Sequence, residues 1–323
     1  MSSTVPPDGP AAAGVSRLRA ILRVDARTQL GEGPTWDRVA EQLRWVDILG
    51  SRVHRFRPAD DRVGPSLATG RHVGAAVPRA RGGLVLALAG GFALLEPAAD
   101  PADVDEQHPS DGPAAPDIAI AIPVEADRPE NRMNDGKCDP AGRFWAGTMA
   151  YAETVGAGSL YRLDPDLRVT TALERVTISN GLGWSPDGRT MYYIDSGTGG
   201  VDAFRYDPSS GAIDERRQVV VIAPADGVPD GLTVDAEGGL WVALWGGGAV
   251  HRYSPVGTLD RVVELPCRLV TSCAFGGDRL EELFITTATV GLTDAELAAQ
   301  PGAGGLFSCR PGVLGLPATP FAG

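Results

Sequence analysis

Four oxygen-bearing side chains each stand immediately before a glycine, at widely separated points of a 323-residue chain. In chain order they are Glu32, Asp135, Asn180 and Asp230. None of the four histidines in the sequence occupies a matching position. Oxygen-only donor sets suit hard divalent ions such as Ca²⁺, Mg²⁺ or Mn²⁺, and suit Zn²⁺ less well. If the fold brings these side chains together, they predict a divalent cation site, because facing carboxylates would otherwise repel one another.

The same positions mark a repeated pattern: a polar residue, glycine, a few strand residues, a turn, and then a hydrophobic strand. Clear copies are ISNGLGWSPDGRTMYYID and PDGLTVDAEGGLWVAL, and two weaker copies begin at Val73-Gly74 and Thr271-Ser272. The six copies start at positions 32, 73, 135, 180, 230 and 271. Units of about 40 to 50 residues, each with about four short strands, predict an all-β six-bladed β-propeller with a central metal site.

Composition agrees with many short strands joined by turns, because the chain contains 42 Gly and 26 Pro. We expect residues 1–20 to form a flexible N-terminal tail and residues 21–323 to form a single propeller. Residues 98–117 have the composition of a solvated insertion. Residues 21–26 (ILRVDA) are expected to pair into the last blade and close the ring, which removes an open sheet edge.

In a propeller, the inner strand of each blade starts beside the central channel. We therefore expect a first turn, at the polar-Gly pair, to deliver the chain to the axis and a second turn to send it back outward. A single NG or DG pair is more often only a turn, but four copies in the same register favour a common site. Glu32 is the most informative of the four, since Glu is a poor turn former.

Other recurring residues have simpler interpretations. Asp47 and Asp195 are expected to bond to blade loops from the ends of middle strands. Blade packing, more than a ligand platform, is expected of four tryptophans: Trp36, Trp145, Trp184 and Trp241. The cysteines show no zinc-type spacing, and Cys138 and Cys273 are expected to be free thiols in strands.

Charge and motifs exclude several classes of function. A formal net charge of −12 argues against nucleic acid and anionic membranes as partners. No apolar run reaches signal-peptide or membrane-span length, which predicts a cytoplasmic protein. Ser179 and Ser272 lack a GxSxG elbow, which argues against a serine hydrolase.

At this point the motifs resemble those of the regucalcin / senescence marker protein / gluconolactonase family of six-bladed propellers. The matching segments are GEGPTWD, NRMNDGKCDPAGRFWAGTM, ISNGLGWSPDGRTMYYIDS, PDGLTVDAEGGLWVALWGGGAVHRYSPVG and TSCAFGGDRLEELFITTA, with PGAGGLF and FAG near the end. The resemblance implies a lactonase that opens sugar-acid lactones with one bound divalent ion (Ca, Mg, Mn or Zn). The family's metal ligands fall on Glu32, Asn180 and Asp230, and Asp230 also matches its acid/base residue.

The resemblance also implies a substrate-binding pair at Arg132 and Asn134, while the role of Asp135 stays open. A salt bridge from Arg132 to Glu130 or Glu153 is the alternative interpretation of the arginine. The family's M-A-E-E-T run, whose second Glu contacts substrate, is Met-Ala-Tyr-Ala-Glu-Thr here. Glu153 matches that substrate-binding Glu only if one residue is inserted, and the following lid segment is shorter, so substrate preference stays open.

We therefore expect a monomeric, metal-dependent hydrolase that converts a sugar lactone to the aldonic acid. Two alternatives keep the fold. An aryl-ester or organophosphate hydrolase would be expected to have two histidines near the site, and a calcium-binding regulatory propeller would not turn over any substrate. The sequence does not indicate which sugar lactone or which metal is native.

Overall fold

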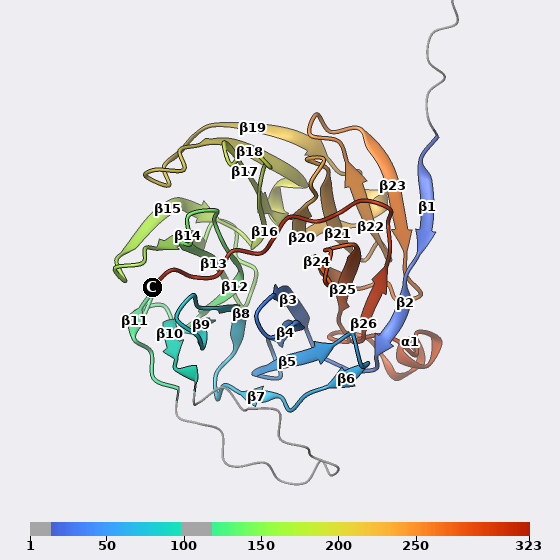
Figure 1. The fold of residues 1–323 in the computed structure, drawn as a ribbon, viewed down its shortest axis with the longest axis horizontal. Helices are drawn as coiled ribbons and strands as arrows, with labels where there is room; N and C mark the ends of the chain where they lie inside the picture. The colour runs from blue at the N-terminus through green and yellow to red at the C-terminus, as the bar shows by residue number, and fades with distance from the viewer. Residues whose placement is uncertain (1–13, 98–117) are drawn as a thin grey trace, which may run out of the picture.

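The computed structural model describes residues 14–97 and 118–323. Six sheets stand around a central channel, which confirms the six-bladed β-propeller (Figure 1). The inner strands contact one another in chain order, β3 to β8, β12, β16, β20 and β24, and β24 contacts β3 again. Within the described part of the chain, no helix has the length and apolar content needed to cross a bilayer.

The strands of the six blades, in chain order and starting with the inner strand, are as follows. The first three blades contain β3 (Gly31–Asp37), β4 (Gln42–Asp47), β5 (Arg52–Arg57), β6 (Arg62–Val63) and β7 (Leu67–Ala68); β8 (Val73–Pro78), β9 (Leu84–Leu88), β10 (Gly91–Leu95) and β11 (Ile122–Pro123); and β12 (Asn131–Cys138), β13 (Phe144–Ala150), β14 (Gly158–Leu163) and β15 (Val169–Val176). The last three contain β16 (Ser179–Trp184), β17 (Thr190–Asp195), β18 (Gly200–Tyr206) and β19 (Ile213–Val221); β20 (Val228–Val234), β21 (Leu240–Trp245), β22 (Ala249–Tyr253) and β23 (Leu259–Glu264); and β24 (Val270–Gly276), β25 (Glu282–Thr287) and β26 (Leu306–Cys309). The short helices are η2 (Ser196–Thr198), η3 (Pro224–Asp226) and α1 (Asp294–Ala299).

Two N-terminal strands add to the last two blades. β2 (Ile21–Val24) pairs antiparallel with β26, so the predicted closure of the last blade is confirmed. The predicted flexible tail is wrong for residues 16–19, which form β1 (Ser16–Arg19) and pair in parallel with the edge strand β23. Leu18 packs on the core there, and Arg17 forms an ion pair with Glu264 at 2.7 Å. The first 13 residues and the predicted solvated insertion at 98–117 lie outside the described residues.

The predicted first turn of each repeat is instead a β-bulge inside the inner strand. All six inner strands shift register there, between Glu32/Thr35, Val73/Ala75, Met133/Gly136, Asn180/Leu182, Pro229/Leu232 and Val270/Ser272. Crowding between blades explains the glycines: a Cβ on Gly231 would lie 2.0 Å from Ser272 Oγ, and one on Gly74 would lie 2.1 Å from Asn134 O. Bulges leave residues unpaired and re-aim their side chains, so here they direct polar side chains to the channel.

Aspartates at the ends of middle strands hold the segments that lead into these bulges. Asp47 accepts hydrogen bonds from the backbone N–H groups of Gln29 and Leu30, both at 3.0 Å. Asp195 does the same for Thr177 and Ile178, both at 3.0 Å. The predicted bonding to blade loops is confirmed, and it fixes the approach to Glu32 and Asn180.

The second turn of each repeat is present as predicted, between inner and middle strands. Asp139 accepts from the backbone of Arg143 at 3.0 Å and from Trp145 Nε1 at 2.9 Å. Asp235 accepts from Trp241 Nε1 at 2.8 Å. All four tryptophans predicted to pack between blades are buried in the core clusters, and Cys138 and Cys273 are buried free thiols.

Candidate active site at one mouth of the channel

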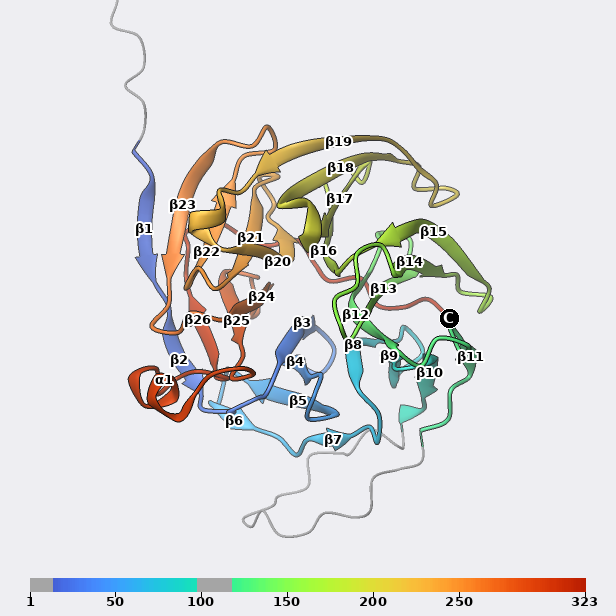
Figure 2. The ribbon, with the colours of Figure 1, turned by 180° about the vertical axis from the view of Figure 1, so that it is seen from behind.

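The three predicted metal ligands lie together at the mouth where the inner strands begin, called here the site mouth. Glu32, Asn180 and Asp230 are 3%, 4% and 8% exposed. The carboxyl groups of Glu32 and Asp230 lie close enough that each shifts the pKa of the other. The bulge after Asn180 packs on the strand of Asp230, because a Cβ on Gly181 would lie 2.8 Å from Asp230 O. This mouth faces the viewer in Figure 2.

The carboxyl groups at the site mouth are strongly destabilised as anions. Burial, followed by the charge of Asp135, raises the pKa of Glu32 to about 8. Burial, followed by the charges of Glu32 and Asp135, raises the pKa of Asp230 well above its usual value. Burial also raises the pKa of Asp135. A bound cation would remove this penalty, because an opposite charge nearby favours the ionised form of a carboxyl group.

The oxygen atoms present fit a hard divalent cation of this kind. Among residues 14–97 and 118–323, no three His, Cys, Asp or Glu side chains are arranged to hold a metal ion. The ligand set would therefore be two carboxylates, from Glu32 and Asp230, together with the amide oxygen of Asn180. Asp135 acts on this pair through its charge, and its own carboxylate accepts from Gly136 N at 2.7 Å.

A chain of hydrogen bonds joins three blades at the site mouth. Arg132 Nη1 donates to Asn134 Oδ1 at 2.6 Å, and Asn134 Nδ2 donates to Asn180 Oδ1 at 2.8 Å. Asn180 Nδ2 donates to Ser196 Oγ at 2.8 Å, and Ser196 Oγ donates to Pro229 O at 2.6 Å. These hydrogen bonds fix the orientation of the Asn180 amide, with its oxygen toward Asn134 and its nitrogen toward Ser196. A carbonyl oxygen has a second lone pair, so Asn180 Oδ1 can also accept a cation.

Arg132 lies near the carboxyl groups of Glu32 and Asp230, and some of its N–H donors are not used by the described residues. It is 7% exposed, and it forms no ion pair with any described residue, so neither predicted salt bridge is present. Its Nη1 donates to Met133 O and Asn134 Oδ1, while its Nε and Nη2 donate to none of the described residues. Burial lowers its pKa, which the nearby acidic groups partly oppose. The guanidinium is therefore a buried cation with two nitrogens able to bind a ligand.

Three residues at this mouth were not predicted from the sequence. Tyr151 lies with its ring centre 5.9 Å from the Arg132 guanidinium, and its hydroxyl is 2.8 Å from His72 Nδ1. A histidine, His72, is therefore present at the mouth. Its position directly before the predicted anchor Val73 is the sequence signal that could have indicated its place there. Ser196 directly follows Asp195, but its place in the amide chain depends on the neighbouring blade.

Glu153, the predicted substrate contact on the lid segment, is not joined to the rest of the site. Its side chain is exposed, and that side chain forms no hydrogen bond or ion pair with the described residues, while the backbone N–H donates to Ala150 O at 2.9 Å. It lies near enough to raise the pKa of Arg132 through its charge, and its backbone φ is 53°. Its part in substrate binding therefore stays a prediction.

The class defined by this geometry is the six-bladed propeller with polar residues gathered at one mouth of its channel. Residues 30–289 match the model of the SMP-30/Gluconolactonase/LRE-like region. The chain belongs to this family.

Similar proteins cover almost the whole chain. YvrE of Bacillus subtilis (strain 168), named provisionally as a sugar lactone lactonase, is 38% identical over 314 residues, covering 95% of this chain and 99% of its own. Regucalcin of Gallus gallus is 40% identical over 304 residues, covering 92% and 96%. A crystal structure of regucalcin from Agrobacterium tumefaciens, described as a calcium-binding protein, is 28% identical with a TM-score of 0.86, covering 96% and 99%.

Proposed function

We propose that this protein is a divalent-cation-dependent lactonase that hydrolyses sugar-acid lactones to the open-chain acids. The observation that carries the proposal is the pairing of Glu32 with Asp230 beside Arg132, whose Nε and Nη2 remain available. An acidic pair with raised pKa values beside an available cation suits an acyl-transfer site better than a purely structural one. Membership of the family, and the lactonase name of one relative, support it.

In this proposal the cation is held by Glu32, Asn180 and Asp230. When bound, it supplies positive charge that polarises the lactone carbonyl. Asp230 accepts a proton from the attacking water as the new C–O bond forms at the carbonyl carbon. When the bond from that carbon to the ring oxygen breaks, Asp230 returns the proton to the ring oxygen. One water is consumed, and one hydroxy acid is formed.

Arg132 and Asn134 have different tasks in this mechanism. The free nitrogens of Arg132 suit the carbonyl or hydroxyl oxygens of the substrate. Both amide hydrogens of Asn134 are engaged, with Ser179 O at 2.7 Å and Asn180 Oδ1 at 2.8 Å. Asn134 therefore orients the Asn180 amide first, and contact with the substrate requires it to exchange one of these bonds.

Substrate turnover distinguishes this proposal from the two alternatives. An aryl-ester or phosphotriester hydrolase was expected to have two histidines near the site, and the described residues place one, His72, at the mouth. A calcium-binding regulatory propeller needs no acid/base residue.

The experiment is proton release with a pH indicator, at a saturating divalent ion, from five- and six-membered sugar lactones, phenyl acetate and a phosphotriester. The proposal predicts that the lactones react fastest. Preference for phenyl acetate or the phosphotriester would replace the proposal with the ester-hydrolase alternative.

A further inference from the structure

A cavity of about 490 Å³ lies at the mouth opposite the candidate active site. Its walls come from the far ends of the inner strands, including Trp36, Trp184, Thr233 and Phe275. Residues 313–323, called here the C-terminal strap, cross this face, in front of the channel in Figure 1 and behind it in Figure 2. The volume lies in the range of cavities that bind small organic ligands.

The C-terminal strap is tied at both ends and spans the cavity between them. Gly315 N donates to Leu280 O at 2.7 Å at one end, and Phe321 N donates to Pro78 O at 2.9 Å at the other. Residues 316–320 make no backbone hydrogen bond to any described residue, and 316–319 line the cavity. The strap therefore forms a wall of this space that few bonds hold in place.

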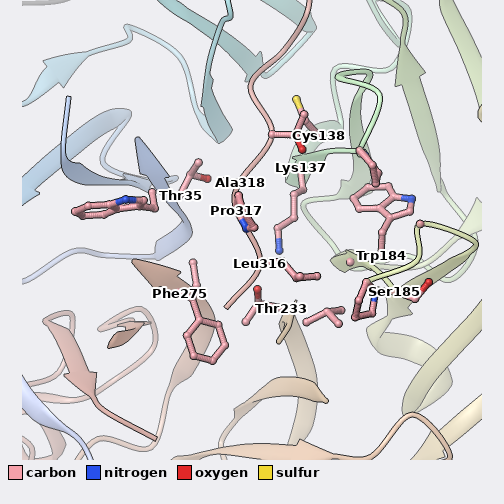
Figure 3. A pocket seen from close by; sticks show the side chains of 18 of the residues that line it. Thr35, Lys137, Cys138, Trp184, Ser185, Thr233, Phe275, Leu316, Pro317 and Ala318 are labelled. Atoms are coloured by element: carbon pink, nitrogen blue, oxygen red, sulfur yellow. The ribbon is translucent and has the colours of Figure 1, made fainter. Parts of the chain in front are cut away.

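One cation faces this largely apolar space. The chain contains 29 Lys and Arg residues, of which 28 are arginine, so Lys137 is its only lysine. Figure 3 shows its side chain extending into the space bordered by Trp184, Thr233, Phe275 and Leu316. Among the lining residues, the other charged side chain is Asp187, which is exposed at the rim.

The Lys137 ammonium is only partly satisfied by the protein. It donates to Leu232 O at 2.6 Å and forms no ion pair with any described residue. An ammonium group has three donors, so two of them are left for water or a ligand. Burial lowers its pKa, and the charge of Asp135 opposes that shift. Lysine is a compact point charge that suits one carboxylate, whereas arginine would need room for its planar fork.

We infer that this cavity is a second binding site, which takes a small apolar monocarboxylate with its carboxylate on Lys137 Nζ and its apolar body between Trp36, Trp184, Phe275 and Leu316. One cation in an apolar cavity compensates one negative charge, which disfavours dicarboxylates. The aromatic and aliphatic walls disfavour polyhydroxylated acids, including the product of the proposed lactonase. The site is distinct from the candidate active site, and the inference does not rest on the proposed function.

The single lysine makes a direct test possible in the full-length protein. Reductive dimethylation labels amines, so only Lys137 and the α-amino group of the chain react, and peptide mass spectrometry separates them. The probe is 2-naphthoate, with neutral 2-naphthamide and gluconate as comparisons. Saturating 2-naphthoate is expected to slow labelling of Lys137 by at least about tenfold and to leave the α-amino group unchanged. Equal labelling with and without 2-naphthoate, equal protection by the amide, or protection by gluconate alone would overturn the inference.

Calorimetric titration of variants provides the second measurement. The wild type is expected to bind 2-naphthoate about tenfold or more tightly than 2-naphthamide. Lys137→Met should abolish this preference, Lys137→Arg should retain part of it, and the exposed Arg217→Met, with the same change in net charge, should leave it unchanged. If Lys137→Met does not fold, the labelling of the wild type still decides. A preference that survives in folded Lys137→Met would overturn the assignment to Lys137.

Discussion

The Nδ2 atom of Asn134 in the third blade donates to Oδ1 of Asn180 in the fourth, at 2.8 Å. Because Asn180 Nδ2 is held in turn by Ser196, the amide has one orientation, with its oxygen fixed before any ligand arrives. A preorganised ligand oxygen lowers the ordering cost of binding. The link also makes cation binding depend on residues that would not themselves touch the cation.

Loss of the Ser196 hydroxyl should weaken cation binding. In Ser196→Ala, Asn180 Nδ2 loses its acceptor and the amide can rotate, so we expect about a 10- to 100-fold weaker affinity for the activating ion. Isothermal titration of EDTA-treated protein measures it. Thr198→Ala is the matched control, because Thr198 lies in the same helix η2 and its hydroxyl donates only to Asp195 O, away from the Asn180 amide. Unchanged affinity in Ser196→Ala would show that the hydrogen-bond chain does not support the site.

Replacement of the proposed base should remove turnover without unfolding the protein. We expect Asp230→Asn to lower kcat by about 10²- to 10⁴-fold at a saturating ion concentration. Its melting temperature without metal should be unchanged or higher, because a buried repulsive carboxyl group is removed. The exposed Asp226→Asn serves as control. Turnover like that of the wild type in Asp230→Asn would rule out its role as base.

The metal-free protein should lose stability as pH rises. Burial raises the pKa of Glu32 from 4.5 to about 8, so between these values the folded state binds more protons than the unfolded state. The contribution of Glu32 to the free energy of unfolding is therefore fully present below about pH 4.5. As the pH rises toward 8, this contribution falls by up to about 1.4 kcal/mol per pH unit. Urea unfolding of EDTA-treated protein from pH 5 to 8 measures the slope.

Two comparisons identify the source of that slope. Glu32→Gln should flatten it, while the exposed Glu41→Gln should not. A saturating divalent ion should restore stability most at high pH, since its ligands must be deprotonated. Stability of the metal-free protein that rises steadily over this pH range would contradict the assignment.

The Tyr151 ring should affect substrate binding more than chemistry. Its ring packs beside Arg132 at 5.9 Å, at the edge of the site mouth. We expect Tyr151→Ala to raise KM for the preferred lactone roughly two- to fivefold with little change in kcat. Tyr151→Phe keeps the ring and loses only the bond to His72, so its KM should stay near that of the wild type. An equal fall in kcat for both variants would point to a chemical role of the hydroxyl.

The glycine after Asp230 should be required by packing. A Cβ at Gly231 would lie 2.0 Å from Ser272 Oγ and 2.7 Å from Ser272 Cα. We expect Gly231→Ala to destabilise the fold by about 1–3 kcal/mol and to lower Tm by several degrees. Calorimetric melting measures it, with Gly14→Ala as control, since no heavy atom lies within 4 Å of a Cβ there. An unchanged Tm would show that the inner strands can separate at the bulge.

The repeat of a polar residue followed by glycine was sufficient to predict the six blades and the convergence of Glu32, Asn180 and Asp230. The segment 21–26 predicted the closure of the ring. The repeat predicted the wrong local structure, because NG and DG favour both turns and crowded bulges, and only the neighbouring blade distinguishes them. Ser196 and His72 were missed because their partners lie in other parts of the chain. The strand at residues 16–19 was missed because its partner, β23, lies more than 240 residues away in the chain.

Cation add-back to stripped protein tests the proposed cation dependence of the lactonase most directly. Protein treated with EDTA is assayed for proton release from the preferred sugar lactone, before and after adding Ca²⁺, Mg²⁺, Mn²⁺ or Zn²⁺ singly. A cation-dependent lactonase should show negligible release after stripping and restored release with at least one ion, with no restoration in Asp230→Asn. Full release without any added ion, or no release from folded protein shown by titration to have bound the ion, would contradict the proposal.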